Sequence, residues 1–139
     1  MNIYKIWLQR ILVVLGIGLL VAIIPVFFPV STMATIHGWL GLGEFPDNPI
    51  TIYLARSTSA LYAIHGAIIL LTGIKINELE LLVPILGWIH VVIGIVMLGI
   101  DLTTPMPWYW TAVEGVPISL GGVLVLWLWK RSQQVGPAQ

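Results

Sequence analysis

Two histidines near the middle of long apolar segments are the side chains best suited to chemistry in this sequence. His65 and His90 stand among apolar and small residues. A helix rises about 1.5 Å per residue, so counting from the loop between the two segments places both imidazoles within roughly 3 Å of one level. Two histidines on neighbouring antiparallel helices can ligate a b-type haem or another metal, bind a quinol, transfer protons, or form a structural hydrogen bond.

Three charged residues, Arg56, Asp101 and Glu114, fall at a second common level nearer one end of these segments. A charged side chain inside a membrane costs about 2.5–3.5 kcal/mol at the centre, so we expect these charges to be paired. In one interpretation Arg56 bridges both carboxylates and ties three helices together. In the other, the cluster lines an outward-facing pocket that binds an anionic or carbonyl head group, or passes protons. The carboxylates lie too far from the histidines to complete a zinc site, so we expect no metal of that kind.

Helical spacing separates these residues into faces. Gly87, His90, Gly94, Met97 and Asp101 follow steps of three and four, which places them along one seam where the glycines allow another backbone or a flat ligand to come close. His65 follows Arg56 by nine residues, a rotation of about 180° on a helix. The stretch from residue 53 to 66 therefore serves two neighbours and is not one catalytic cluster, and no nucleophile and base combination for hydrolysis is evident.

The composition is that of an integral membrane protein. The chain has 139 residues, of which 58% are hydrophobic and 9% charged, and its mean hydropathy is +0.99. A soluble domain carries about 25% charged residues. The net charge is zero and the basic residues are scattered, so we expect no nucleic-acid partner. The absence of cysteine excludes disulfides, thiolate metal sites and a cysteine nucleophile.

The apolar runs predict four membrane-spanning helices. The run from Ile11 to Val30 is 20 residues long, enough to span the bilayer and too long for the core of a signal peptide. Asn48 and Pro49 suit the first positions of the second helix, and Asn77 with Glu80 resembles a capping box for the third. We expect one membrane domain over 1–139, with spans at about 4–28, 49–73, 78–102 and 108–130.

The distribution of charge predicts the orientation. Five basic residues flank the spans on the side of both termini, whereas the opposite loops contain Glu44 and Asp47 and neither Lys nor Arg. The positive-inside rule places both termini in the cytoplasm. In the outer loop, 31–47, apolar residues at helical spacing predict a short helix on the membrane surface, where His37 belongs either to a lid resting on the bundle or to a site.

Two stretches carry a resemblance to known proteins. The runs "HGWLGLGEFPDNPITIYLARSTSALYAIHG" and "MLGIDLTTPMPWYWTAVEG" resemble small four-helix inner-membrane proteins of bacteria. The size and four-span layout are also similar to DoxX-type membrane proteins, although no DoxX motif matches residue by residue. The resemblance implies a bacterial inner-membrane location and this architecture, and implies no activity.

The sequence therefore predicts an all-α, antiparallel four-helix membrane bundle with a short outer surface segment. Its small size and small-residue faces favour a non-catalytic accessory or scaffold subunit of a larger membrane complex, in contact with the bilayer and with other subunits or a second copy. The alternative is a redox or quinone-linked membrane protein in which His65 and His90 bind b-type haem or quinol.

Overall fold

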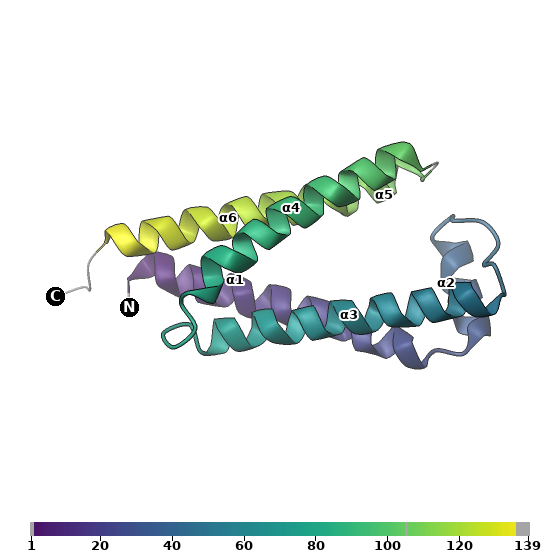
Figure 1. The fold of residues 1–139 in the computed structure, drawn as a ribbon, viewed down its shortest axis with the longest axis horizontal. Helices are drawn as coiled ribbons and strands as arrows, with labels where there is room; N and C mark the ends of the chain where they lie inside the picture. Colours follow the sequence, from purple (N-terminus) through teal and green to yellow (C-terminus); the bar gives the residue numbers. More distant parts are fainter. Residues whose placement is uncertain (1, 105, 136–139) are drawn as a thin grey trace.

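The computed structural model describes residues 2–104 and 106–135 and contains α-helices and one 3₁₀-helix, with no strand in these residues. Four long helical segments pack antiparallel, as predicted, and both termini lie at the same end of the molecule (Figure 1). The elements in chain order are α1 (Ile3–Leu20), η1 (Val21–Phe27), α2 (Val30–Trp39), α3 (Pro49–Ile74), α4 (Leu82–Thr103), α5 (Trp108–Val113) and α6 (Gly115–Gln134).

Four segments are long and apolar enough to cross a membrane: Ile3–Phe27, Pro49–Ile74, Leu82–Thr103 and Trp108–Gln134. Their outward faces carry large exposed apolar side chains, such as Val14 on α1, Leu61 on α3 and Ile95 on α4. A soluble protein rarely exposes a continuous apolar surface of this kind. The chain is therefore a small polytopic membrane protein whose outer surface contacts lipid.

Prolines explain where these helical segments begin, tighten or break. Pro25 lies inside η1, where the first span tightens from α-helix to 3₁₀-helix. Pro117 cannot donate a hydrogen bond to residue 113 and its ring crowds that carbonyl. The last span is accordingly broken at Glu114, which has φ −107° and ψ −84°. Pro49, by contrast, occupies the first turn of α3, and the Asn48 side chain caps that turn by accepting a hydrogen bond from Thr51 N at 3.0 Å, as predicted.

The third span begins four residues later than predicted, at Leu82 and not at 78. Asn77 and Glu80 lie in turns and do not cap the helix, which starts with Leu81 in the cap position and without a side-chain cap. Pro84 explains the difference. In a helix beginning at residue 78 it would stand in the interior, whereas in α4 it occupies the first turn, where its missing N–H costs nothing.

Glycines allow the helices to pack in two close pairs. A Cβ on Gly66 of α3 would meet Leu20 N at 2.5 Å, and one on Gly16 of α1 would meet Leu70 N at 2.5 Å. In the second pair, a Cβ on Gly94 of α4 would meet Gly115 O at 2.7 Å. Small residues of this kind let backbones approach in membranes, where apolar surface burial drives association weakly. The molecule therefore consists of two hairpins, α1–α3 and α4–α6.

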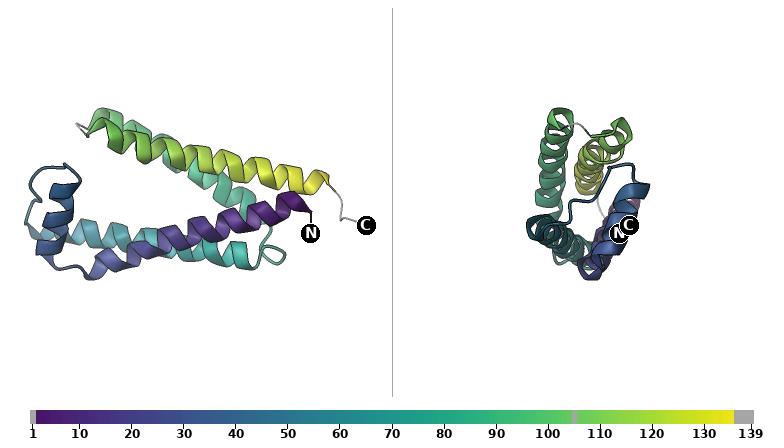
Figure 2. Two further views of the ribbon diagram at one scale, coloured as in Figure 1. Left: turned by 180° about the vertical axis from the view of Figure 1, so that it is seen from behind. Right: turned by 90° about the vertical axis from the view of Figure 1, so that its right-hand side faces the viewer.

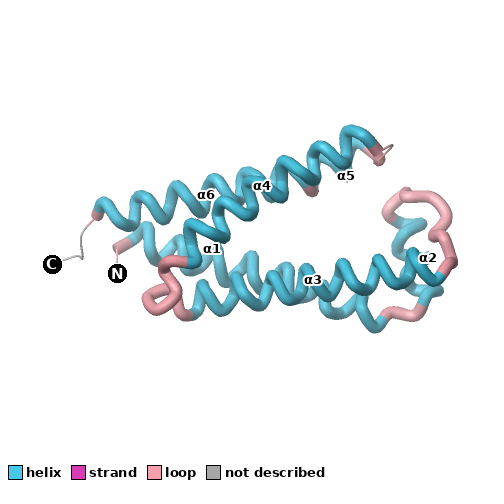
Figure 3. Tube along the Cα trace, in the orientation of Figure 1, coloured by secondary structure: helices cyan, strands magenta, loops and turns pink. Residues whose placement is uncertain are grey.

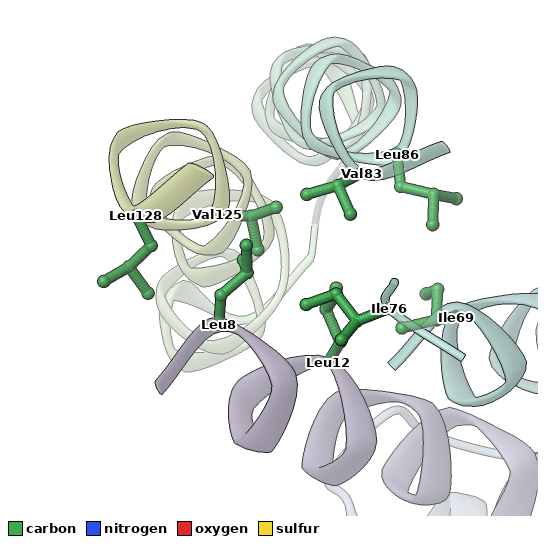
Figure 4. Close-up of a cluster of buried hydrophobic side chains, with 8 residues drawn as sticks. All are labelled: Leu8, Leu12, Ile69, Ile76, Val83, Leu86, Val125 and Leu128. Atoms are coloured by element: carbon green, nitrogen blue, oxygen red, sulfur yellow. The ribbon is translucent and has the colours of Figure 1, made fainter. Parts of the chain in front are cut away.

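The hairpins converge at one end and diverge at the other. Figures 1 and 2 show them meeting at the end that carries both termini, and separating toward the end where α2 lies. The connecting loops stand at the two ends of the bundle (Figure 3). The buried apolar core lies at the converging end, which we call the terminal end, and consists of Leu8, Leu12, Ile69, Ile76, Val83, Leu86, Val125 and Leu128 (Figure 4).

Polar contacts also join the two hairpins at the terminal end. Lys5 of α1 forms an ion pair of 3.1 Å with Glu80, and Glu80 also accepts a hydrogen bond from Gln133 of α6. The Asn2 side chain donates to Ser132 O at 2.8 Å and to Val135 O at 2.7 Å. This end is thus closed by both apolar packing and hydrogen bonds.

The outer connection contains a short helix, as predicted. α2 runs across the direction of α3 at the end away from the termini, which we call the open end (Figures 1 and 2). Its C-terminus turns at Gly41, whose φ of +68° favours glycine and where a Cβ would meet the Tyr109 hydroxyl at 2.7 Å. The Tyr109 hydroxyl in turn donates to Leu40 O, which ties α5 to the outer segment.

Candidate functional site

The two histidines of the spans face each other across the hairpins. The rings of His65 on α3 and His90 on α4 have centroids 5.1 Å apart and are tilted by 35°. His90 Nδ1 lies 2.7 Å from Leu86 O, so this nitrogen carries the proton and Nε2 is an acceptor when the ring is neutral. His65 Nε2 is buried and has no hydrogen-bond partner among the described residues. The pair therefore retains unused hydrogen-bonding capacity in an apolar setting.

This arrangement does not fit a haem between the two rings. Imidazoles that bind one iron from opposite faces stand roughly 6 Å apart at their centres, because each metal–nitrogen bond is about 2 Å long. The porphyrin must also lie between them, and rings 5.1 Å apart leave no space for it. Within the described residues, no three His, Cys, Asp or Glu side chains gather as a metal-binding group.

The two carboxylates lie near each other at the outer part of the second hairpin. Glu114, at the break between α5 and α6, accepts a hydrogen bond from Trp110 Nε1. Gly115, the neighbour of Glu114, packs against Leu98, which is about one helical turn from Asp101 on α4. The Asp101 side chain is 6% exposed, and its Oδ2 has no partner in the described part of the chain. The sequence analysis placed these two residues at one level, and the structure brings them together.

Arg56 does not bridge these carboxylates. Its Nη2 donates to Phe28 O at 3.1 Å, and the ion pairs within residues 2–104 and 106–135 are Lys5–Glu80 and Lys75–Glu78. Arg56 and His65 point to opposite faces of α3, as the nine-residue spacing predicted. Arg56 is at the expected depth but on the side of α3 that faces away from α4 and α6. Counting residues along a helix gives the depth of a side chain and does not show which helix it faces.

A large cavity opens between α2, α3 and α5. Its volume is about 640 Å³, within the range of about 300–1,000 Å³ typical of small-molecule sites. Most of its lining is apolar, and Thr58, Ser59, His37 and Trp110 contribute the polar groups facing the hairpins. Unlike Thr72 and Thr103, which bond back to their own helix, Thr58 and Ser59 make no hydrogen bond within the described residues. We call this space the outer chamber. Its full lining is Pro25, Phe28, Met33, Ile36, His37, Leu40, Phe45, Thr51, Leu54, Ala55, Thr58, Ser59 and Trp110.

His37 closes one side of the outer chamber. Its Nδ1 lies 3.1 Å from Gly43 O, and its ring packs edge-on against Phe45 with centroids 5.5 Å apart. These contacts fold the loop after α2 back onto the helix. The role of His37 as a lid residue stays a prediction, and its position in the chamber wall is compatible with either a lid or a site.

A second cavity shares Trp110 with the outer chamber and lies between α1, α3 and the last span. It has a volume of about 340 Å³. Tyr62 and Glu114 are its ionisable lining residues. The sequence analysis did not include Tyr62 or Trp110 among the candidate site residues. The signal was nevertheless present, since Thr58, Tyr62 and His65 are spaced by four and three residues and so follow one face of a helix.

No protein-family model, curated protein or solved structure matches this chain.

Proposed function

We propose that this protein is a non-catalytic accessory or scaffold subunit of a larger membrane complex. The observation that carries the proposal is the divergence of the hairpins toward the open end, where buried polar atoms lack partners (Figure 1). Asp101 Oδ2 is such an atom near that end, and His65 Nε2 is another, nearer the middle of the spans. An unsatisfied polar group is costly in an apolar environment, so a segment of another subunit that enters the open end and supplies hydrogen bonds is favoured.

The proposed location is the bacterial inner membrane with both termini in the cytoplasm. Lys5, Arg10, Lys75, Lys130 and Arg131 flank the spans at the terminal end, and the loops at the open end contain neither Lys nor Arg. The positive-inside rule favours this orientation. Reporter fusions after residue 135 and within the loop at residues 40–47 test it: only the first should give a cytoplasmic signal, and the reverse result would contradict the orientation.

Purification from native membranes in mild detergent tests the subunit proposal. We expect a stoichiometric partner that stays bound to the wild-type chain and is lost from Ala55→Trp, because the indole fills the outer chamber that Ala55 lines. Ala67→Trp is the matched control, since Ala67 is exposed on the same helix and outside that chamber. A stable, partner-free protein in native membranes, or equal partner binding by both variants, would refute the proposal.

A second candidate function is binding of a quinol or a similar lipophilic molecule with hydrogen-bonding groups. It is favoured by the contact between His65 and His90 and by the second cavity, whose lining residue Tyr62 stands about one helical turn from His65. A quinol hydroxyl would donate to His65 Nε2, and its apolar tail would occupy the chamber. Within this proposal the histidines hold or pass a proton, and no redox step is assigned.

Extraction of quinones from the purified protein, combined with reduced-minus-oxidised visible spectra, tests this second candidate. We expect a bound quinone that His65→Phe and His90→Phe remove while the helical content stays unchanged. A colourless preparation without quinone would leave the subunit proposal as the one to pursue. A b-type haem signal lost in either variant would require the two rings to separate from the arrangement described above.

A further inference from the structure

Arg56 is a positive charge without a carboxylate partner, placed beside a groove on the side of α3 away from the outer chamber. It follows Pro49, the first residue of α3, by seven positions, so its Cα lies about 10 Å along the helix from that end. A long arginine side chain at such a depth can extend its guanidinium toward the membrane surface. Arg56 therefore stands within reach of the head-group region at the open end.

The contacts of Arg56 leave most of its donors unused. Nη2 donates to Phe28 O at 3.1 Å. Phe28 follows η1, has an extended backbone conformation and precedes Pro29. Nε is buried and has no partner among the described residues. A guanidinium has five N–H donors in a planar fork, which matches the oxygens of a phosphate or carboxylate. One carbonyl bond does not neutralise the charge, and an anion from outside the described chain would do so.

The groove beside Arg56 is shaped by aliphatic side chains. It has a volume of about 610 Å³ and is lined by Val26 of η1 and, on α3, by Ile52, Tyr53 and Ala60, with Pro49 and Ser57 completing it. Tyr53 is 65% exposed, and its hydroxyl makes no hydrogen bond within the described residues. The groove thus combines apolar walls with a cation and an exposed phenol, the groups that contact an acyl chain and its head group.

We propose that Arg56 and this groove bind an anionic phospholipid of the leaflet at the open end. The guanidinium binds the phosphate, the Tyr53 hydroxyl donates a further hydrogen bond, and an acyl chain lies along Val26 and Ala60. Charge complementarity favours an anionic lipid, and the aliphatic walls favour a lipid over a free phosphate ion. The proposal is independent of what occupies the outer chamber on the opposite face of α3.

Native mass spectrometry of the full chain in detergent, titrated with phosphatidylglycerol and with phosphatidylcholine, tests this proposal. We expect phosphatidylglycerol to bind more tightly. Arg56→Gln should weaken its binding by about tenfold, the loss typical of a hydrogen bond to a charged group. Arg56→Lys should fall between, because lysine keeps the charge and loses the planar fork. Arg10→Gln, at the terminal end, is the charge control and should bind as the wild type does.

A steric variant makes the test independent of the Arg56–Phe28 contact. Ala60→Leu fills the groove and keeps Arg56, so it should also weaken phosphatidylglycerol binding, whereas Ala67→Leu on the same helix should leave it unchanged. The proposal is overturned if Ala60→Leu and Arg56→Gln bind phosphatidylglycerol as tightly as the wild type. It is also overturned if millimolar inorganic phosphate displaces the lipid completely, or if Arg56→Gln releases a partner protein without affecting lipid binding.

Discussion

The terminal end and the open end of this molecule differ in how their helices pack. At the terminal end, eight buried apolar side chains pack together, and Lys5, Glu80, Asn2 and Gln133 join the hairpins by polar contacts. Cavities of about 640 and 610 Å³ lie at the open end, whereas the space beside Trp7 and Trp127 at the terminal end has about 380 Å³. Buried polar atoms without partners occur chiefly away from the terminal end, where Trp129 Nε1 is the exception. One end thus supplies stability and leaves the other free to bind.

The largest expected effect comes from the packing within a hairpin. Gly66→Leu forces a side chain against the backbone of Leu19 and Leu20, since a Cβ alone would meet Leu20 N at 2.5 Å. Overpacking of a tight contact costs about 1–3 kcal/mol, and this contact involves backbone that cannot rotate away, so we expect a loss of about 3 kcal/mol. Thermal or denaturant unfolding in detergent measures it.

Gly121 provides the control for this substitution, because a Cβ there would meet nothing within 4 Å. Gly121→Ala should leave the stability unchanged or slightly higher, as alanine is the better helix former. Equal stability of Gly66→Leu and the wild type would show that the α1–α3 hairpin is not held by this close approach.

The next largest effect is expected from a substitution that stabilises the open end and so tests its difference from the terminal end. Asp101→Asn removes a buried carboxylate whose Oδ2 has no partner, while keeping its shape. We expect the purified protein to gain about 1–2 kcal/mol of unfolding free energy. Asp47→Asn, in an exposed loop, should change nothing. A destabilised Asp101→Asn variant would instead indicate that the carboxylate is satisfied, and would argue against an unfilled open end.

A smaller and local effect is expected at the contact between α5 and the outer segment. Tyr109→Phe removes the hydroxyl that donates to Leu40 O. The loss of about 1 kcal/mol should loosen the outer segment while the hairpins stay intact. Hydrogen exchange should therefore accelerate at residues 36–43 and stay unchanged at the terminal end. Uniform acceleration over both ends would show that the two ends unfold as one unit.

The smallest effect concerns the ion pair at the terminal end and depends on pH. Hydrogen bonds from Gln133 and Lys5 lower the pKa of Glu80 below its ordinary value of 4.5. A lowered folded-state pKa means that the stabilisation is complete above the unfolded-state pKa near 4.5 and is lost as the pH falls through the folded value. Because Glu80 is partly exposed, we expect less than about 1 kcal/mol.

Melting temperatures of the wild type and Glu80→Gln between pH 7 and pH 3 measure this contribution. The two proteins should differ most at pH 7 and converge toward pH 3. Glu78→Gln is the control, since Glu78 pairs with Lys75 within one exposed loop and does not join the hairpins. A constant difference across this pH range would show that the charge of Glu80 is not what links the ends of α1 and α6.

The spans and the cap of α3 could be predicted because they depend on neighbours in the sequence. Apolar runs, Asn48 and Pro49 act within a few residues of one another. The start of α4 was predicted wrongly because an apparent capping box at Asn77 was weighed without Pro84. Glu80 of that box instead pairs with Lys5, which is 75 positions away in the chain. A pattern of neighbouring residues cannot predict such a distant partner.

The sequence predicted the depth of each candidate site residue in the membrane, but not which residues it contacts on other helices. Counting along the helices placed His65 level with His90, and their rings lie 5.1 Å apart. The same counting placed Arg56 level with Glu114, yet Arg56 lies on another face of α3 and donates to Phe28 O. Periodicity gives the direction of a side chain on its own helix. Which helix lies in that direction depends on the glycine contacts and the divergence of the hairpins.

Because the buried core lies at one end, a change in the angle between the hairpins moves their far ends more than their packed ends. α4 has 22 residues, so its far end lies about 33 Å from the point where the hairpins meet. A change of about 5° in the angle between the hairpins moves that end by about 3 Å, while side chains at the terminal end shift by a small fraction of this distance. Changes in bilayer thickness tilt membrane helices at a modest energetic cost. A tilt of one hairpin against the other would therefore change the width of the open end more than that of the terminal end, and the Tyr109–Leu40 hydrogen bond would oppose it.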